Sequence, residues 1–246
     1  FGGTAVGERM GRIYGYKTAY IIETEAQADA ALYDVNSHGI RRSDGRSIAG
    51  RKDIGDYEWL NRAGSARTAD GSEQINDEDM FLLGYVTPHS TGGMNNTFKY
   101  RNLSLSVYVD YALGHSVYNY MYTRGLQTSM GNCNWNLIYD ANDCWQKPGD
   151  KTDVPMLEVG GSYATASNSL IDASYFAIKN ITVGYTLPKR WLKKIDIESL
   201  RIYATLDNIA MFNHMDGMDP QYNFTGSVAY SYTPSRVIAF GIDLNF

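Results

Sequence analysis

Few residues of this chain have the types and the spacing that catalysis or metal binding requires. The four histidines are His38, His89, His115 and His214. No two of them have the spacing of zinc ligands, and the sequence contains no Cys-x-x-Cys. It also lacks nucleotide-binding glycine motifs and the serine elbow of hydrolases. Asp140 and Asp143 could act as paired carboxylates of a glycosidase only by their proximity in the sequence. We therefore predict that the chain is not an enzyme and holds neither a metal ion nor a cofactor.

The composition indicates strands and turns rather than helices. The 246 residues include 20 Tyr and 24 Gly but only 6 Pro, and 43% of them are hydrophobic. The formal net charge of -5 excludes a general basic surface for nucleic acid. A transmembrane helix needs about 20 apolar residues, and no uninterrupted apolar run in this sequence is longer than that of residues 237–240. The chain begins at Phe1 without a signal peptide, so we expect it to be a piece of a longer protein.

Alternation between apolar and polar residues marks several segments as half-buried strands. It is clearest in residues 103–113, 200–207 and 237–246. Segment 175–187 keeps its phase only if a bulge lies near Lys179. We predict about six strands that run antiparallel in sequence order. They lie near residues 12–22, 92–101, 103–121, 175–187, 199–212 and 235–246.

Short turns and long connections alternate between these predicted strands. Residues 100–102 and 188–194 form the short links, and the long connections cover 23–91, 122–174 and 213–234. Outer-membrane barrels have this arrangement, with short periplasmic turns and long extracellular loops. A soluble β-sandwich or lectin-like domain would show the same alternation, although compact domains rarely hold several loops of this length. A short helix is predicted within 25–36 of the first long connection.

Six sequence blocks follow one another along nearly the whole chain. They are VGERMGRIYGY (6–16), WQKPGDKTDVP (145–155), SYFAIKNITVGYTLP (174–188), LRIYATLDN (200–208), GMDPQ (217–221) and FGIDLNF (240–246). In the same order they resemble the blocks VGKPIGSFYGY, RWQKPGDITDVP, YLRLKNITLGYTLP, LRVYVTGQNL, GYDPE and FGLNLTF of the SusC/RagA family of TonB-linked outer-membrane transporters. The chain departs from the family at 176–178, where the family has Leu-Arg-Leu. The family's acidic stretch is degraded here to residues 60–79, and its end at 76–79 lacks the ligand spacing of an EF-hand, so we interpret it as a solvated loop.

The resemblance implies an all-β fold in which residues 1–246 are the C-terminal portion of a large transmembrane β-barrel with long extracellular loops. Six strands cannot close a barrel, so the plug and the remaining strands must lie outside this chain. The implied partners are a SusD-like surface lipoprotein, the TonB–ExbB–ExbD complex acting through the missing N-terminal region, the remaining strands, and outer-membrane lipid. The implied function is import of oligosaccharides or peptides. The alternative is a surface-exposed glycan-binding β-domain without transport.

The alternation also assigns the two faces of each strand. Residues that should face lipid include Leu105, Val107, Val109, Ile202, Leu206, Phe240 and Ile242. Residues that should face the lumen or the plug include Ser106, Tyr108, Asp110, Arg201, Tyr203, Asp207 and Asp243. Tyr108, Asp110, Arg201, Tyr203 and Asp207 are our candidates for substrate contact, with plain solvation as the alternative. Trp135 and Trp145 of the aromatic loop 132–145 could stack on sugar rings, and packing within the loop is the alternative for both.

The chain terminus and the two cysteines carry two further predictions. Outer-membrane proteins that resemble this chain end in a strand with a terminal aromatic residue, which the barrel assembly machinery reads, so the resemblance implies that Phe246 is part of an assembly signal. Cys133 and Cys144 are the only cysteines of the sequence and share one predicted extracellular loop. We predict a disulfide between them, since a cell-surface location permits the bond, with two free thiols as the alternative.

Overall fold

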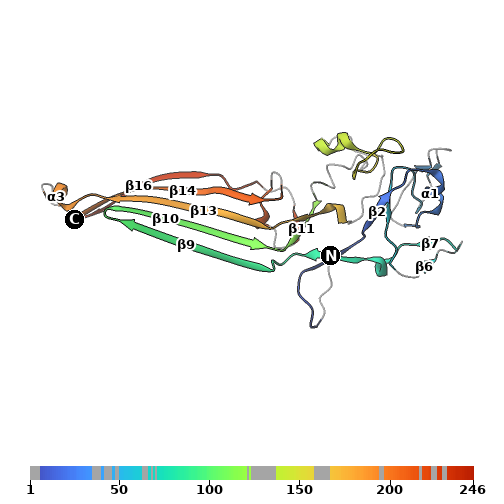
Figure 1. Cartoon of the computed structure of the whole chain (residues 1–246), viewed down its shortest axis with the longest axis horizontal. Coiled ribbons are helices and arrows are strands. Elements are labelled where there is room, and N and C mark those ends of the chain that lie inside the picture. The colour runs from blue at the N-terminus through green and yellow to red at the C-terminus, as the bar shows by residue number, and fades with distance from the viewer. Residues whose placement is uncertain are drawn as a thin grey trace. The chain divides into compact units, whose positions relative to one another are not determined.

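The structure is a computed structural model of the whole chain, and it is almost entirely β (Figure 1). It describes residues 6–34, 40–41, 46–47, 50–62, 66–67, 69, 71–120, 122, 137–157, 167–193, 197–215, 218–222, 226–228 and 232–246. Among these residues, no helix is both long and apolar enough to cross a membrane. The chain forms two compact units, each built from three separate stretches. One consists of 1–86, 117–171 and 225–230, and the other of 87–116, 172–224 and 231–246.

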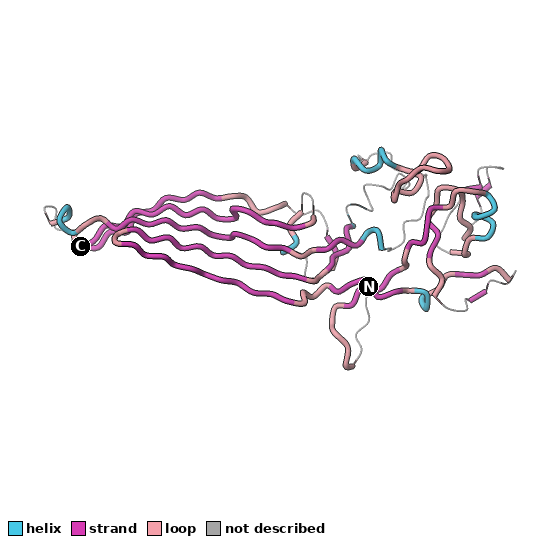
Figure 2. Tube along the Cα trace, in the orientation of Figure 1, coloured by secondary structure: helices cyan, strands magenta, loops and turns pink. Residues whose placement is uncertain are grey.

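A five-stranded antiparallel sheet dominates the second unit (Figures 1 and 2). Its strands are β9 (Ser90–Tyr100), β10 (Leu103–Leu113), β13 (Tyr175–Thr186), β14 (Ser199–Asn213) and β16 (Val237–Asn245). Each strand pairs with the next one in the chain, so the spatial order β16-β14-β13-β10-β9 is the sequence order reversed. Five of the six predicted strands and their antiparallel succession are therefore confirmed.

Short links close two of the strand pairs at one end of the sheet. Between β9 and β10 only Arg101 and Asn102 intervene, and Arg101 takes a φ of 53° because a two-residue hairpin turn needs left-handed backbone. Between β13 and β14 lies the helix α3 (Lys189–Leu192), whose Leu192 is buried. The long connections lie at the other end of the strands, as the sequence predicts.

A bulge interrupts the pairing of β13 with both of its neighbours. Tyr108 pairs with Asn180 but Val109 pairs with Ile178, so Lys179 is the extra residue on β13. On the other side, Asn180 pairs with Asp207 and Ile178 with Ala210, where Asn208 has a φ of 52°. The bulge predicted near Lys179 is thus confirmed, and it keeps the apolar residues of β13 on one face along the whole strand.

The predicted strand 12–22 is wrong as a member of this sheet. It consists of β1 (Arg12–Gly15), which pairs with β8 (Phe81–Tyr85), and β2 (Thr18–Ile21), which pairs with β5 (Tyr57–Trp59). Ile13 is fully buried in the first unit, so the apolar residues of this segment pack into the core of that unit and do not belong to the five-stranded sheet.

The predicted strand 103–121 is also too long. β10 ends at Leu113, and Gly114 breaks the strand with a φ of 72°. The chain continues as β11 (Ser116–Asn119) in a three-stranded sheet with β12 (Leu170–Asp172) and β15 (Ser227–Val228). Since β11 pairs in parallel with β15, residues 116–119 are not part of the antiparallel sheet, which continues from β10 to β13.

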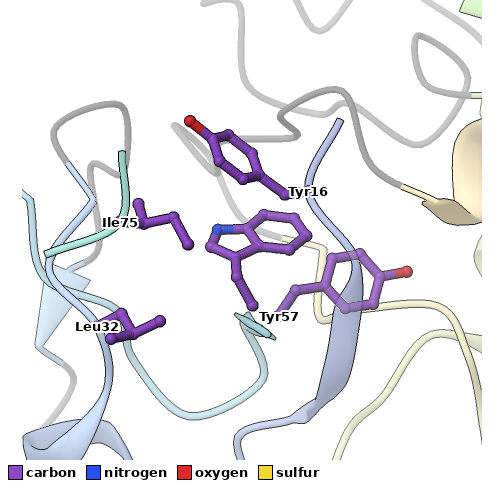
Figure 3. Packing of buried hydrophobic residues seen from close by; sticks show 5 residues of the cluster. Tyr16, Leu32, Tyr57 and Ile75 are labelled. Atoms are coloured by element: carbon purple, nitrogen blue, oxygen red, sulfur yellow. The ribbon is translucent and has the colours of Figure 1, made fainter. Parts of the chain in front are cut away.

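The first unit has a small core of aromatic and aliphatic side chains (Figure 3). Trp59 lies at its centre, with its ring centroid 5.9 Å from those of both Tyr16 and Tyr57, and Leu32 and Ile75 complete the cluster.

The helix α1 (Glu25–Ala30) begins with a capping box, in which Thr24 and Gln27 bond to each other's backbone N–H groups, so the short helix predicted within 25–36 is confirmed. The remaining short elements are β3 (Ile40–Arg41), β4 (Arg46–Ser47), β6 (Ala66–Arg67), β7 (Glu73–Gln74), η1 (Asp77–Asp79), η2 (Tyr139–Asp143), η3 (Ser167–Ser169) and, in the second unit, η4 (Pro220–Tyr222).

A buried ion pair supports this core. Lys52 Nζ lies 2.7 Å from Glu58 Oε1 and 5.3 Å from the centre of the Trp59 ring. Glu58 also accepts hydrogen bonds from the backbone N–H groups of Leu32 and Trp59, while the Trp59 indole donates to Asp34. Burial lowers the pKa of Lys52, and the neighbouring Glu58 opposes that effect. Each charged group of this network therefore depends on its partners.

The acidic stretch 76–79 is a capped turn. Asp79 is buried and accepts hydrogen bonds from the backbone N–H groups of Asn76 (2.9 Å) and Arg62 (3.0 Å). Its carboxylate therefore ties two loop segments of the first unit together.

Candidate functional site

The register of the five-stranded sheet collects most polar side chains on one face. Directly paired residues of antiparallel strands point to the same side, so the pairing extends a face across all five strands. The polar face contains Asn95, Thr97, Lys99, Ser104, Ser106, Tyr108, Asp110, Tyr175, Asn180, Thr182, Arg201, Tyr203, Thr205, Asp207 and Asp243. All seven residues predicted to face the lumen or the plug lie on this one face. We call it the polar face below.

Three glycines let large side chains lie flat on the polar face. A Cβ placed on Gly241 would come within 2.2 Å of the Tyr203 ring, and one on Gly184 within 2.8 Å of the Arg201 guanidinium. A Cβ on Gly93 would reach the Tyr108 hydroxyl at 3.3 Å. Three of the predicted contact residues, Tyr108, Arg201 and Tyr203, are therefore held against the sheet by a glycine on the neighbouring strand.

Hydrogen bonds between side chains cross the strands over the middle of the polar face. Asn180 donates to Asp207 at 2.6 Å, and the hydroxyl groups of Thr182 and Thr205 lie 3.2 Å apart. Further along, Ser106 donates to Asn95 at 3.0 Å. The face is a continuous hydrophilic surface, which suits contact with water or with a polar molecule.

Cationic side chains gather at the end of the polar face that holds the short links. A groove of about 400 Å³ is lined there by Lys99, Arg101 and Arg201 together with serine, threonine and asparagine side chains. Arg201 also pairs with Asp243, with 3.4 Å between Nη1 and Oδ2, and its guanidinium lies 5.4 Å from the centre of the Tyr203 ring. Both partners of this ion pair are well exposed, so it contributes little to stability.

The bulged end of the polar face has more buried polar groups. Asp110 accepts a hydrogen bond from the Tyr175 side chain and interacts electrostatically with Lys179 and Asp219. Lys179 donates a hydrogen bond to Gln221. Asp110 was among the predicted contact residues, whereas Tyr175, Lys179, Asp219 and Gln221 were not.

The opposite face of the sheet is apolar and exposed. Phe240 is 81% exposed, and Phe98 and Ile242 are each 62% exposed. Phe176 and Phe212 lie side by side, with ring centroids 6.4 Å apart. Other side chains on this face are Met94, Leu103, Leu105, Val107, Val109, Ile181, Val183, Ile202, Leu206, Ile238 and Leu244. All seven residues predicted to face lipid belong to it, and an exposed apolar face of this kind marks a surface that contacts lipid or another protein.

The loop residues named as candidates are placed differently. Trp145 is only 2% exposed and packs beside Gly55, so its ring is buried against another segment of the chain and is not open to a ligand in this structure. Trp135 and Cys133 lie outside the described residues. Cys144 is half-buried and packs beside Ala141 and Val154. The disulfide and the contact of Trp135 with sugar therefore stay predictions.

Phe246 follows β16 and is 87% exposed. Its role in assembly also stays a prediction. Among the described residues, no three His, Cys, Asp or Glu side chains are grouped so as to hold a metal ion.

Comparison with curated proteins finds TonB-dependent receptors. No family model matches the chain. The TonB-dependent receptor P3 of Formosa agariphila is 28% identical over 188 residues, which cover 72% of this chain and 18% of that protein. The receptor P39 of the same organism is 25% identical over 269 residues, which cover 98% of this chain and 25% of that protein. The chain thus spans a quarter or less of the length of these relatives.

Comparison with solved structures gives the same result for the fold. The RagAB peptide transporter matches with a TM-score of 0.69 and 22% identity over 96% of this chain and 23% of that one. The RagAB peptide importer in its closed-closed state matches with a TM-score of 0.68 and 21% identity, over 95% and 23%. The chain is thus similar in sequence to TonB-dependent receptors and in fold to RagAB, across a quarter or less of the length of each, in agreement with the ordered motifs that resemble the SusC/RagA family.

Proposed function

We propose that this chain is the C-terminal part of the barrel of an outer-membrane TonB-dependent importer. The observation that carries the proposal is the two-sided sheet, with a hydrophilic face crossed by hydrogen bonds and an exposed apolar face opposite it. Such a sheet matches the wall of a barrel, which separates lipid from a polar interior. The five-stranded sheet is called the wall below. Among the strands that the structure describes, the edge strands β9 and β16 each have a neighbour on one side only, so further strands of the same barrel would complete their hydrogen bonds.

The same proposal assigns substrates and partners. The polar face would line the path of an oligosaccharide or a peptide, and the polar groups of both substrate classes suit its amide, hydroxyl and charged side chains. A SusD-like lipoprotein would cap the extracellular side, and the TonB–ExbB–ExbD complex would act through the plug. The support for these partners is the relationship to TonB-dependent receptors and the likeness to RagAB.

The alternative, a glycan-binding surface domain without transport, is favoured by less. It depended on the aromatic loop 132–145, where Trp145 is buried in this structure. A sheet face as apolar as the one that holds Phe240 has no role in such a domain.

Adjacent residues of β16 provide the test. Phe240 lies on the apolar face and Ala239 on the polar face. In the full-length protein in lipid vesicles, a fluorophore on Phe240→Cys should be quenched by brominated lipid, and one on Ala239→Cys should be quenched by a water-soluble ion. Equal quenching at both positions by either agent would contradict the membrane wall. Uptake of labelled oligosaccharides and peptides by cells with and without TonB then distinguishes transport from surface binding.

A further inference from the structure

A short segment contacts the bulged end of the polar face. It comprises residues 218–222, including the single turn η4, and is called the strap below. Gln221 of the strap accepts a hydrogen bond from Lys179 Nζ, and its own Nε2 lies 3.9 Å from Met211 Sδ. Met211 pairs with Ala177, which pairs with Asp110, so the contacts of Gln221 are with the polar side of the wall.

The strap brings a second carboxylate to the wall. Asp219 is 7% exposed, and its Oδ1 accepts a hydrogen bond from the Gln221 N–H at 2.9 Å. Its Oδ2 is buried without a hydrogen-bond partner among the described residues, and the same holds for Oδ1 of Asp110. Asp110 interacts electrostatically with both Asp219 and Lys179. The carboxylate of Asp110 on the wall therefore interacts with one carboxylate of the strap and with one cation of the wall, which act on it in opposite directions.

The strap also closes one side of a pocket. A cavity of about 290 Å³ is lined by Met218 and Asp219 of the strap, by Lys179, Met211 and Asn213 of the wall, and by Thr233, Pro234 and Arg236 before β16. Moving the strap away would therefore widen this cavity on the side of the strap.

We propose that Lys179 is a positioning residue that latches the strap onto the polar face, and that release of this latch widens the cavity during transport. A charge-assisted hydrogen bond to the neutral Gln221 is weaker than an ion pair with a carboxylate would be, so breaking the latch costs less free energy. The SusC/RagA motif aligned with this stretch, GYDPE, has Glu at that position. The link to transport rests on the proposed function, whereas the latch itself depends only on the contacts of Lys179.

Labelling of the strap tests the latch in the purified full-length protein. Cys133 and Cys144 are replaced by serine, and Met218→Cys reports the exposure of the strap through its rate of reaction with a maleimide. Lys179→Met should raise this rate about tenfold or more, the ratio that loss of a hydrogen bond to a charged group corresponds to. Gln221→Glu should lower the rate, since it replaces the hydrogen bond by an ion pair. Lys99→Met, which removes a cation from β9 on the same face, should leave the rate unchanged.

The outcomes separate the latch from the proposed function. An unchanged rate in Lys179→Met, or a faster one in Gln221→Glu, overturns the latch. If Lys179→Met is poorly folded, the Gln221→Glu variant still decides, because it changes no residue of the wall. A separate labelling of intact cells tests the surface location. It uses Tyr232→Cys as the reporter, because Tyr232 is 98% exposed. No labelling at Tyr232→Cys on intact cells would overturn the surface location and leave the result on the latch standing.

Discussion

The ring of Tyr203 lies directly over Gly241 on the neighbouring strand of the wall. A methyl group on Gly241 would come within 2.2 Å of Cζ and 2.4 Å of the hydroxyl oxygen of Tyr203. The two residues are cross-strand partners in the register of β14 and β16. The absence of a side chain at Gly241 thus leaves room for the tyrosine ring and determines where the ring packs on the polar face.

Gly241→Ala should therefore displace Tyr203 and destabilise the wall by about 1–3 kcal/mol, the range of overpacked sites. The temperature at which the full-length barrel loses its compact mobility on a gel measures this change. Combining Gly241→Ala with Tyr203→Ala should recover most of the loss. Ala239→Ser, on the same strand and face, should have little effect. If Gly241→Ala were as stable as the parent, the ring would not depend on the space at Gly241.

Lys52→Met should destabilise the first unit by about 3–5 kcal/mol, because it leaves Glu58 buried without its cation. Adding Glu58→Gln should restore part of that stability, since it removes the buried negative charge. The N–H groups of Leu32 and Trp59 donate to different carboxylate oxygens, so the amide carbonyl keeps only one of these two hydrogen bonds and the recovery is partial. Limited proteolysis of the full-length protein measures the opening of this unit. The exposed pair Arg67 and Glu73 offers the control, as Arg67→Met should change little. Greater protease sensitivity in the double variant than in Lys52→Met would contradict this account.

Acidification should loosen the chain around His115. Its imidazole is buried, with Nδ1 unpartnered among the described residues, and burial lowers its pKa, while Asp172 opposes that effect. Unfolded His115 therefore binds a proton more readily than folded His115. Its stability contribution is complete well above pH ~6.5, the ordinary histidine value, and is lost as the pH falls below it.

Hydrogen exchange of the segments around 113–117 and 172–175 at pH 5 and pH 7.5 checks this expectation. Exchange should be faster at the lower pH in the parent protein, and His115→Gln should remove most of the difference. His89→Gln is the matched control. The same pH dependence in His115→Gln would assign it to another group.

The predicted bond between Cys133 and Cys144 should protect both thiols on intact cells. In the chain-entropy model, closing a loop of this size with a disulfide stabilises the folded protein by roughly 3 kcal/mol. Labelling with a maleimide before and after reduction measures the free thiols. Complete labelling of both cysteines without a reductant would exclude the bond.

Removal of Phe246 should lower the amount of full-length protein in the outer membrane, if the assembly machinery reads this residue. Quantitative blotting of outer-membrane fractions measures the effect. Phe240→Leu, which keeps an apolar side chain on the same strand, is the control. Equal amounts of both variants would show that the terminal aromatic is dispensable.

The wall could be predicted from the sequence because its alternation is long and its turns are short. Segments 103–113 and 237–246 carry the pattern over many residues, and the broken phase of 175–187 even indicates the bulge at Lys179. Residues 12–22 alternate too, but any half-buried strand does so, and here Ile13 and its neighbours pack into the first unit. Local periodicity cannot tell which partner a strand will bury against.

The polar contacts that depend on tertiary structure could not be predicted. Lys179 and Gln221 are 42 positions apart, and only the path of the strap brings them together. Lys52 and Glu58 look like ordinary surface charges of a long loop until the chain folds over them. Trp145 belongs to an aromatic loop that suggests a platform for sugar rings, yet its ring is buried beside Gly55, which is 90 positions earlier in the sequence.

The pairing of β11 with β12 has a consequence for how such a protein can change over generations. These strands begin and end the stretch inserted between β10 and β13, and because they are neighbours in one sheet, the stretch leaves and rejoins the wall at adjacent points. A hydrogen bond from Ala173 N–H to the His115 carbonyl, at 2.9 Å, holds these points together. Because the two ends of the insertion are already held together, its length adds little to the loop-closure entropy that pairing of β10 with β13 costs. The inserted stretch can therefore change in length and sequence while the wall keeps its register.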